Sequence, residues 1–100
     1  MAGDSQGERL DRVGLRQTLA RVAILDVVGE AGDAVDALAI YKALVARDRG
    51  VSLATVYRVT TELEERGLLS RDRTVTGKSL YAVAGATRLR AIHAPGRRSR

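Results

Sequence analysis

The stretch "VSLATVYRVTTELEERG", residues 51–67, decides the fold because it predicts one helix with two chemically different halves. Ser52 is a favourable N-cap, and Gly67 provides the C-terminal stop. The predicted inward face consists of Leu53, Val56, Val59, Thr60 and Leu63. On the outward face Tyr57 and Arg58 come early in the helix. The acids come late, at Glu62, Glu64 and Glu65. This separation leaves two alternatives: a surface that binds a partner, or an ordinary surface helix with Tyr57 half-buried at its rim.

Two helices are predicted at the start of the chain. The first covers Glu8 to Val13 and ends near Gly14. The segment "GLRQT" is then a loop that leads to Thr18, a plausible N-cap. Leu19 to Glu30 forms the second helix, and its scarcity of strongly polar side chains indicates that it is largely buried. The glycines of "GEAGDA" are a usual helix stop.

The next helix is predicted over Ala37 to Asp48, with Asp36 as its N-cap and Gly50 after its end. Its apolar stripe consists of Ala37, Ile40, Tyr41, Leu44 and Val45, which follow helical spacing. Leu38 lies off this stripe, so we expect it to be exposed.

A hairpin follows the quoted helix. In "LLSRDRTVTGKSLYAV", Leu68 to Arg73 and Ser79 to Val83 are predicted strands, and Gly77 can take the positive φ of the turn between them. Along the second strand, alternate residues are expected to face the helices. Three core helices followed by a hairpin predict a winged helix-turn-helix, a mainly α fold with a small β-hairpin.

Length and charge divide the chain into three parts. Its 100 residues suffice for one domain. We expect residues 1–7 to be disordered, residues 8–84 to form the winged helix-turn-helix domain, and residues 85–100 to form a basic, disordered tail. Residues 1–84 hold 12 Lys or Arg and 12 Asp or Glu, so the five arginines of residues 85–100 supply the whole net charge of +5. Any surface for nucleic acid in the folded part must therefore arise from segregation of charge.

Composition excludes several other classes. The chain has no Cys, which excludes disulfides and thiolate metal sites, and no apolar run long enough to span a membrane. With one His and no glycine-rich phosphate loop, nothing indicates an enzyme. We expect a cytoplasmic protein.

A helix that enters the major groove with its N-terminal end explains the two halves of residues 51–67. The first turns would meet base edges, and the positive end of the helix dipole would face phosphates. The side chains that would then face DNA are Ala54, Thr55, Tyr57, Arg58 and Thr61. Arg58 could bind guanine or phosphate, and Tyr57 a thymine methyl or phosphate. Glu62 and Glu65 would repel phosphate, so we expect them to sit away from it.

The segments "GLRQTLARVAILDVV", "IYKAL", "SLATVYRVTTELEERGLLSR" and "GKSLYAV" resemble the DNA-binding domain of the ferric uptake regulator (Fur) family over about residues 8–84. The resemblance implies that Tyr57 and Arg58, with Ala54 and Thr55 beside them, read the major groove. It also implies that Arg16 reaches the minor groove of AT-rich double-stranded DNA, where the negative potential is enhanced. Arg21 and Lys78 are then candidate phosphate contacts.

The resemblance stops at functions that the family couples to metal. Its C-terminal domain, which dimerises and binds metal, is not recognisable here. The DNA-binding domain would contribute a His ahead of the third helix and a Glu in the last strand, but Ala34 and Ala82 occupy those places. His93 is an isolated His in an Arg-rich segment. We therefore expect no metal cofactor. Two copies, or a heteromeric partner, would have to associate through another surface, for which Leu38 is a candidate.

Two functions remain open at this point. The first is a transcriptional regulator, in particular a repressor, that occludes promoter DNA without a metal switch. The second is a protein-interaction module that modulates a full-length paralogue or its DNA complex. The combination of Arg16, Tyr57 and Arg58 favours the first, because a protein adaptor does not need these three DNA-facing residues.

Overall fold

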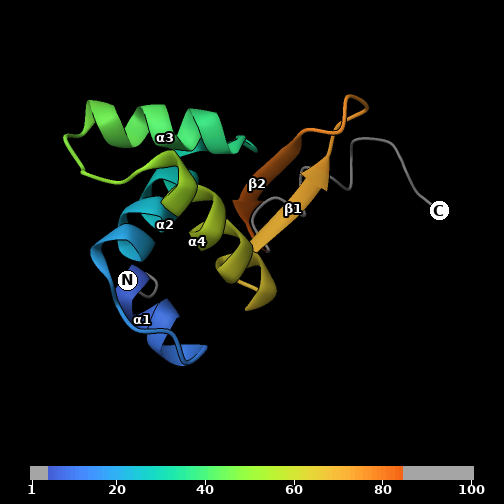
Figure 1. Cartoon of the computed structure of the whole chain (residues 1–100). Coiled ribbons are helices and arrows are strands. Elements are labelled where there is room, and N and C mark those ends of the chain that lie inside the picture. Colours follow the sequence, from blue (N-terminus) through green and yellow to red (C-terminus); the bar gives the residue numbers. More distant parts are fainter. Residues whose placement is uncertain (1–4, 85–100) are drawn as a thin grey trace.

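The computed structural model describes residues 5–84, which form four helices and a two-stranded antiparallel sheet (Figure 1). In chain order the elements are α1 (Gln6–Arg12), α2 (Leu19–Ala31), α3 (Ala37–Ala46), α4 (Leu53–Glu65), β1 (Leu69–Arg73) and β2 (Ser79–Val83). This arrangement confirms the predicted mainly α winged helix-turn-helix, with α3 and α4 as the helix-turn-helix and β1–β2 as the wing. The predicted disorder of residues 1–4 and the predicted basic tail, residues 85–100, lie outside the described residues.

The first helix begins earlier than the sequence suggested. Ser5 caps α1 through a capping box: its Oγ accepts from the backbone N–H of Glu8, and the Glu8 carboxylate accepts from the backbone N–H of Ser5. Leu10 is fully buried and attaches α1 to the core. The expectation that disorder extends through Gly7 is therefore wrong for residues 5–7, because the local cap and one buried leucine order them.

The predicted caps of the other three helices are confirmed. The side chains of Thr18, Asp36 and Ser52 each accept a hydrogen bond from a backbone N–H three residues later, which satisfies an otherwise unpaired donor of the first turn. Gly32 ends α2 with a φ of 73°, a left-handed conformation that costs glycine little.

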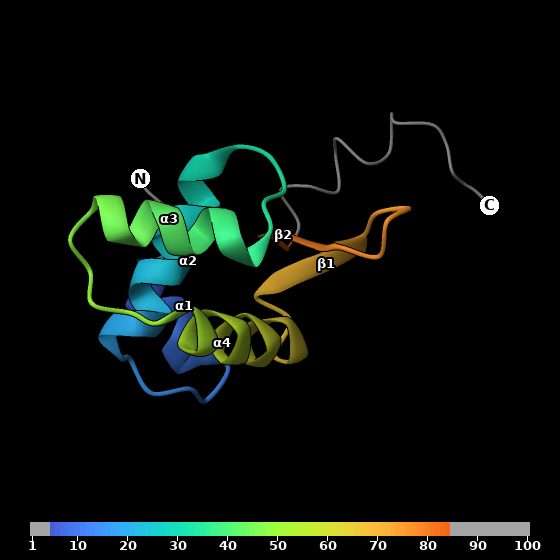
Figure 2. The same cartoon turned by 45° about the horizontal axis from the view of Figure 1, so that its top comes forward.

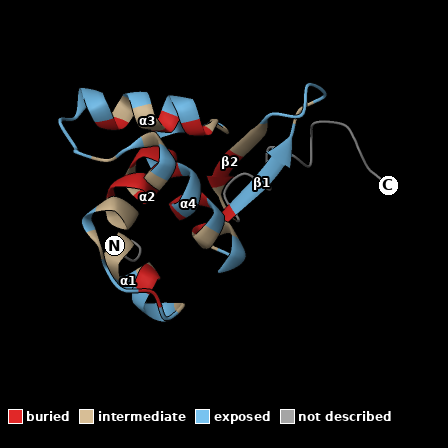
Figure 3. Cartoon of the chain, in the orientation of Figure 1, coloured by how far each residue is buried: buried red, intermediate tan, exposed pale blue. Residues whose placement is uncertain are grey.

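The core lies where α2, α3 and α4 pack against one another (Figures 1 and 3). Its largest fully buried side chains are Leu10, Ile24, Leu25, Ile40, Leu44 and Leu63. No helix of residues 5–84 is both long and apolar enough to cross a membrane.

One residue of the α3 stripe was placed on the wrong side. Val45 is 55% exposed, whereas the prediction put it with the buried residues. Each helical residue advances about 100°, so Val45 lies within about 20° of Leu38, which is 44% exposed as expected. Val45, eight residues after Ala37, therefore lies at the edge of the buried stripe rather than at its centre.

The wing is a regular hairpin in which Leu69 pairs with Val83 and Arg73 with Ser79. The predicted alternation along β2 is not seen, because neighbouring Tyr81 and Ala82 are both buried. Tyr81 exchanges two backbone hydrogen bonds with Val35, of 2.7 and 2.9 Å, at the edge of β2 that β1 leaves free. This second pairing, together with contact from α2, covers β2 more completely than a simple two-stranded wing would be covered.

Candidate nucleic-acid interface

The helix α4 has a buried apolar inner face and an exposed polar outer face. Val56, Val59 and Leu63 are at most 1% exposed. Around them the predicted DNA-facing residues point outward: Ala54, Tyr57, Arg58 and Thr61 are exposed and Thr55 is partly exposed. Tyr57 is 54% exposed, which fits both a residue that faces DNA and a tyrosine half-buried at the rim of an ordinary surface helix. The helix therefore presents an aromatic ring and a cation side by side.

The hydroxyl groups of Ser52, Thr55 and Thr61, at the cap and on the outer face of α4, form hydrogen bonds within the helix and its cap. Ser52 Oγ accepts from the backbone N–H of Thr55 at 3.1 Å and donates to Thr55 Oγ1 at 3.0 Å. Thr61 Oγ1 donates to the carbonyl of Tyr57 at 3.0 Å, one turn back. Thr61 has used its O–H donor and offers a ligand an acceptor oxygen and a methyl group, whereas Thr55 accepts from Ser52 and keeps its O–H donor for a ligand.

A carboxylate lies between two guanidinium groups on the same side of the molecule. Arg21 Nε and Nη2 donate to Glu62 Oε1 at 3.3 and 3.1 Å, and Arg58 Nη1 donates to Glu62 Oε2 at 3.4 Å. We expected Glu62 and Glu65 to lie away from the DNA-facing residues. Glu65 is exposed, but Glu62 forms an ion pair with Arg58, one of those residues. The pairing of Arg58 with Glu62 could have been predicted from the sequence, because residues at i and i+4 of a helix are neighbours. The contact of Glu62 with Arg21, 41 positions away, could not be predicted in this way.

The loop that carries Arg16 lies against α4. It follows α1, and Figure 2 shows it beside α4 in blue. Arg21 Nη1 donates to the backbone carbonyl of Arg16 at 3.1 Å, and the guanidinium of Arg66 binds the carbonyl of Val13. Arg21 belongs to α2 and pairs with Glu62 of α4, and Arg66 is the C-cap of α4, so both bonds link the loop to α4. Arg21 and Arg58 thus share the Glu62 carboxylate, Arg21 also holds the backbone of Arg16, and the Arg16 side chain is exposed.

Lys78 belongs to a different group of residues. Its Nζ lies 3.0 Å from Asp36 Oδ2, at the N-terminus of α3, and its side chain is 60% exposed. Asp36 also accepts from the backbone N–H of Ala39 at 2.8 Å. That backbone bond, followed by the bond from Lys78, holds the pKa of the Asp36 carboxyl below its ordinary value of 3.8. The wing and α3 are thus joined by a charged cap.

The lowered pKa of Asp36 predicts a loss of stability in acid. A carboxyl whose folded pKa is depressed contributes stability above its unfolded pKa, and this contribution disappears as pH falls from about 3.8 through the lower folded value. Asn keeps the capping oxygen but does not titrate. Urea unfolding at pH 7 and pH 3 should therefore show a smaller acid-induced loss for Asp36→Asn than for the unsubstituted chain. Equal losses would mean that the Asp36 cap contributes nothing to acid sensitivity. Asp36→Ala should cost about 1 kcal/mol at pH 7.

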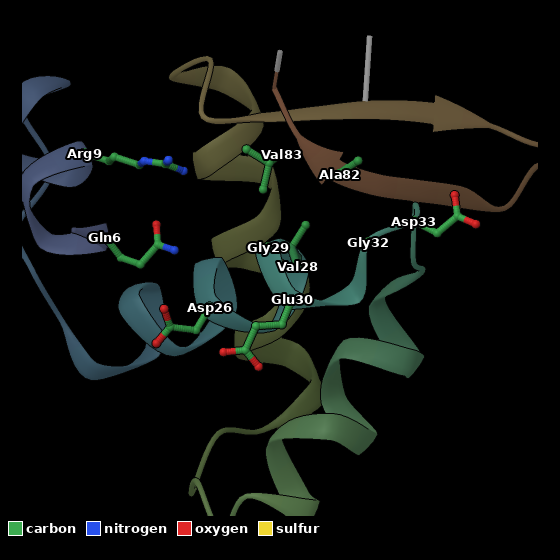
Figure 4. Close-up of a pocket in the computed structure, with 10 residues that line it drawn as sticks. All are labelled: Gln6, Arg9, Asp26, Val28, Gly29, Glu30, Gly32, Asp33, Ala82 and Val83. Atoms are coloured by element: carbon green, nitrogen blue, oxygen red, sulfur yellow. The ribbon is translucent and has the colours of Figure 1, made fainter. Parts of the chain in front are cut away.

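The positions implied for metal ligands do not fit a metal. Ala34 and Ala82 have no side-chain donor atom, and residues 5–84 contain no group of three or more His, Cys, Asp or Glu placed to hold an ion. The predicted candidate His93 lies outside the described residues. Nearby, a pocket of about 390 Å³ opens between α1, the end of α2 and β2 (Figure 4). Its acids do not form a metal site either, and Glu30 binds Arg47 at 2.6 Å.

Known proteins resemble this chain over most of its length. A sequence model of the ferric uptake regulator family matches residues 12–93. The ferric uptake regulation protein of Brucella abortus is 40% identical over 77 residues, which are 77% of this chain and 55% of that protein. Its counterpart in Bordetella parapertussis is 37% identical over 78 residues, 77% of this chain and 56% of that protein. The chain therefore spans about half the length of the curated relatives it matches.

Solved structures show the same likeness. The ferric uptake regulator of Pseudomonas aeruginosa, solved with manganese, superimposes with a TM-score of 0.77 at 36% identity, covering 81% of this chain and 61% of the other. The regulator of Vibrio cholerae gives a TM-score of 0.74 at 32% identity, covering 78% and 60% of the two chains. At these identities the likeness extends beyond the fold to the sequence of the winged helix-turn-helix.

Proposed function

Because the chain belongs to the ferric uptake regulator family, we propose that it is a sequence-specific regulator of transcription that binds double-stranded DNA and performs no enzymatic reaction. One observation carries the proposal most directly. The exposed face of α4 presents Tyr57 and Arg58, and a chain of hydrogen bonds through Glu62 and Arg21 holds the loop of Arg16 beside that face. Two cations that can enter neighbouring grooves are thereby held on one surface.

In the proposed complex α4 lies in the major groove. Arg58 donates to the O6 and N7 atoms of guanine, and the ring of Tyr57 contacts a thymine methyl group. Ala54, Thr55 and Thr61 line the same face, with small or methyl-bearing side chains that allow close approach to base edges. These contacts give sequence selectivity, whereas phosphate contacts set orientation.

The cations around α4 take different roles. Arg16 is exposed and enters the adjacent minor groove, which favours AT-rich DNA because a narrow groove concentrates negative potential. Lys78 is 60% exposed and can turn from Asp36 toward a phosphate. The side chain of Arg21 is only 17% exposed, and its donors are used by Glu62 and Arg16. We therefore assign Arg21 chiefly to holding the loop rather than to a phosphate.

Regulation would occur by occlusion of promoter DNA, which makes a repressor. A single winged helix forms a small interface with DNA, so two copies on an inverted repeat, or one copy with a partner, would be needed for tight binding. Ala34 and Ala82 cannot ligate metal, so DNA binding by this chain should not depend on a metal ion.

An in vitro selection from a random duplex pool at near-physiological salt tests the proposal. We expect enrichment of an AT-rich inverted repeat, and the same motif with EDTA or with added manganese. Enrichment of one half-site would instead indicate a monomer that needs a partner. If no motif is enriched although circular dichroism shows folded protein, sequence-specific recognition is wrong, and a protein-interaction module becomes the better explanation. A motif that appears only with manganese would contradict metal independence.

A further inference from the structure

We propose that Glu62 is a positioning residue that sets the spacing between the two groove-reading cations, Arg58 and Arg16, and thereby controls sequence specificity. The inference rests on the proposed function, since it assigns a role within that DNA interface. Glu62 itself contacts no base in this scheme. It acts through Arg21, whose guanidinium binds the Glu62 carboxylate with two donors and the Arg16 carbonyl with a third.

The two ion pairs of Glu62 differ in strength. The pair with Arg21 uses two donors, at 3.3 and 3.1 Å, and its side chains are only 17% and 29% exposed. The pair with Arg58 is a single contact of 3.4 Å, and the Arg58 side chain is 61% exposed. Exposed pairs of this kind are weak and readily exchanged. Glu62 therefore retains Arg21 when DNA binds, whereas Arg58 can leave Glu62 for a base.

The charge of Glu62 is unfavourable for DNA affinity in general. A carboxylate bound to Arg58 and Arg21 lowers the positive potential of the surface, and each unit of positive charge at such a surface strengthens sequence-independent binding through counterion release. The benefit of Glu62 is that it fixes the position of the Arg16 loop relative to the recognition helix. Because Arg21 joins Glu62 on α4 to the backbone of Arg16, the loop cannot shift relative to the recognition helix without breaking either the hydrogen bond from Arg21 to the Arg16 carbonyl or the partly buried Arg21–Glu62 ion pair.

Removing the charge of Glu62 should therefore change specific and non-specific binding in opposite directions. Glu62→Gln keeps the size of the side chain but leaves a single neutral acceptor oxygen for two guanidinium groups. The loop of Arg16 is then held less firmly, which weakens binding to the correct sequence. At the same time the surface becomes more positive by one charge, which strengthens binding to any duplex.

The test compares Glu62→Gln with Glu65→Gln, an exposed acid of the same helix that undergoes the same charge change. Dissociation constants are measured for the selected duplex and for a scrambled duplex of equal composition, at several salt concentrations. The specificity ratio is the dissociation constant for the scrambled duplex divided by that for the selected duplex. We expect this ratio to fall about tenfold for Glu62→Gln and to stay within about twofold of the unsubstituted chain's value for Glu65→Gln. Equal ratios for the two variants would overturn the positioning role.

A second measurement separates positioning from simple loss of structure. In an Arg16→Ala background, Glu62→Gln should reduce specific affinity much less, because the loop no longer carries the side chain to be positioned. A variant that only folds poorly would lose binding to both duplexes in equal proportion, with no coupling to Arg16, and would contradict the proposal. Arg21→Lys should lower the ratio as Glu62→Gln does, because one ammonium group lacks the planar fork that binds both partners.

The controls also distinguish the two proposals. If the unsubstituted chain binds the selected and scrambled duplexes equally, then the proposed function fails, and the role of Glu62 fails with it. If the unsubstituted chain discriminates between them but Glu62→Gln behaves like Glu65→Gln, only the role of Glu62 is wrong.

Discussion

Replacing Arg58 with alanine is expected to abolish sequence discrimination and to weaken binding to the selected duplex by about 10- to 100-fold, the equivalent of one lost bidentate base contact. Arg58 is the cation on the exposed face of α4, and within residues 5–84 it is held by a single long contact of 3.4 Å to Glu62. Losing that exposed pair should change the free energy of unfolding by less than about 0.5 kcal/mol. Electrophoretic mobility shift or fluorescence anisotropy with both duplexes would measure the effect.

Arg47→Ala is the matched control for this substitution. Arg47 is an exposed arginine paired with Glu30 at the far end of α2, so its removal lowers the net charge equally without touching α4. We expect Arg47→Ala to weaken binding to the selected and scrambled duplexes by the same small factor. If Arg58→Ala behaves like Arg47→Ala, then α4 does not read the major groove with this residue, and the assignment of the interface is wrong.

The second large effect is expected from Leu63→Ala, which should lower the free energy of unfolding by about 2–5 kcal/mol. Leu63 is 0% exposed and lies on the face of α4 opposite to Arg58, where it packs into the core. A domain of this size has a total stability of only about 4–12 kcal/mol. Loss of one buried leucine would therefore weaken the packing of the recognition helix against the core and increase the population of the unfolded state.

Urea unfolding followed by circular dichroism checks this prediction. Leu38→Ala is the control, because the same chemical change at a leucine that is 44% exposed should cost no more than about 0.5 kcal/mol. DNA affinity of Leu63→Ala should fall only as far as the folded fraction falls. Similar midpoints for the two variants would mean that Leu63 does not support the core as the structure indicates.

Local chemistry made most of the secondary structure predictable. The caps at Thr18, Asp36 and Ser52 were read correctly because an N-cap is a contact within one turn, so it depends on a few adjacent residues. The same holds for the wing, where Gly77 adopts a φ of 89° between two short strands. The helix α1 begins two residues before its predicted start at Glu8, because the capping box between Ser5 and Glu8 brings Gln6 and Gly7 into the first turn.

The candidate interface was predictable only in part. Helical spacing placed Tyr57 and Arg58 on the outer face of α4, and the structure confirms that they are exposed. Spacing could not show that Glu62 meets Arg21 or that Lys78 meets Asp36, since these partners are 41 and 42 positions apart. Such contacts depend on how helices and wing pack, and periodicity within one segment contains no information about that packing.

The sequence by itself determined the elements of this protein, their order and the face that each helix buries, because capping, turn formation and apolar spacing act over a few neighbouring residues. Only the tertiary structure decided that Arg21 and Arg58 converge on the Glu62 carboxylate and that Arg21 also binds the backbone of Arg16. That convergence results from the packing of α2 against α4, in which burial of Ile24 and Leu63 fixes the distance between side chains that the sequence keeps far apart.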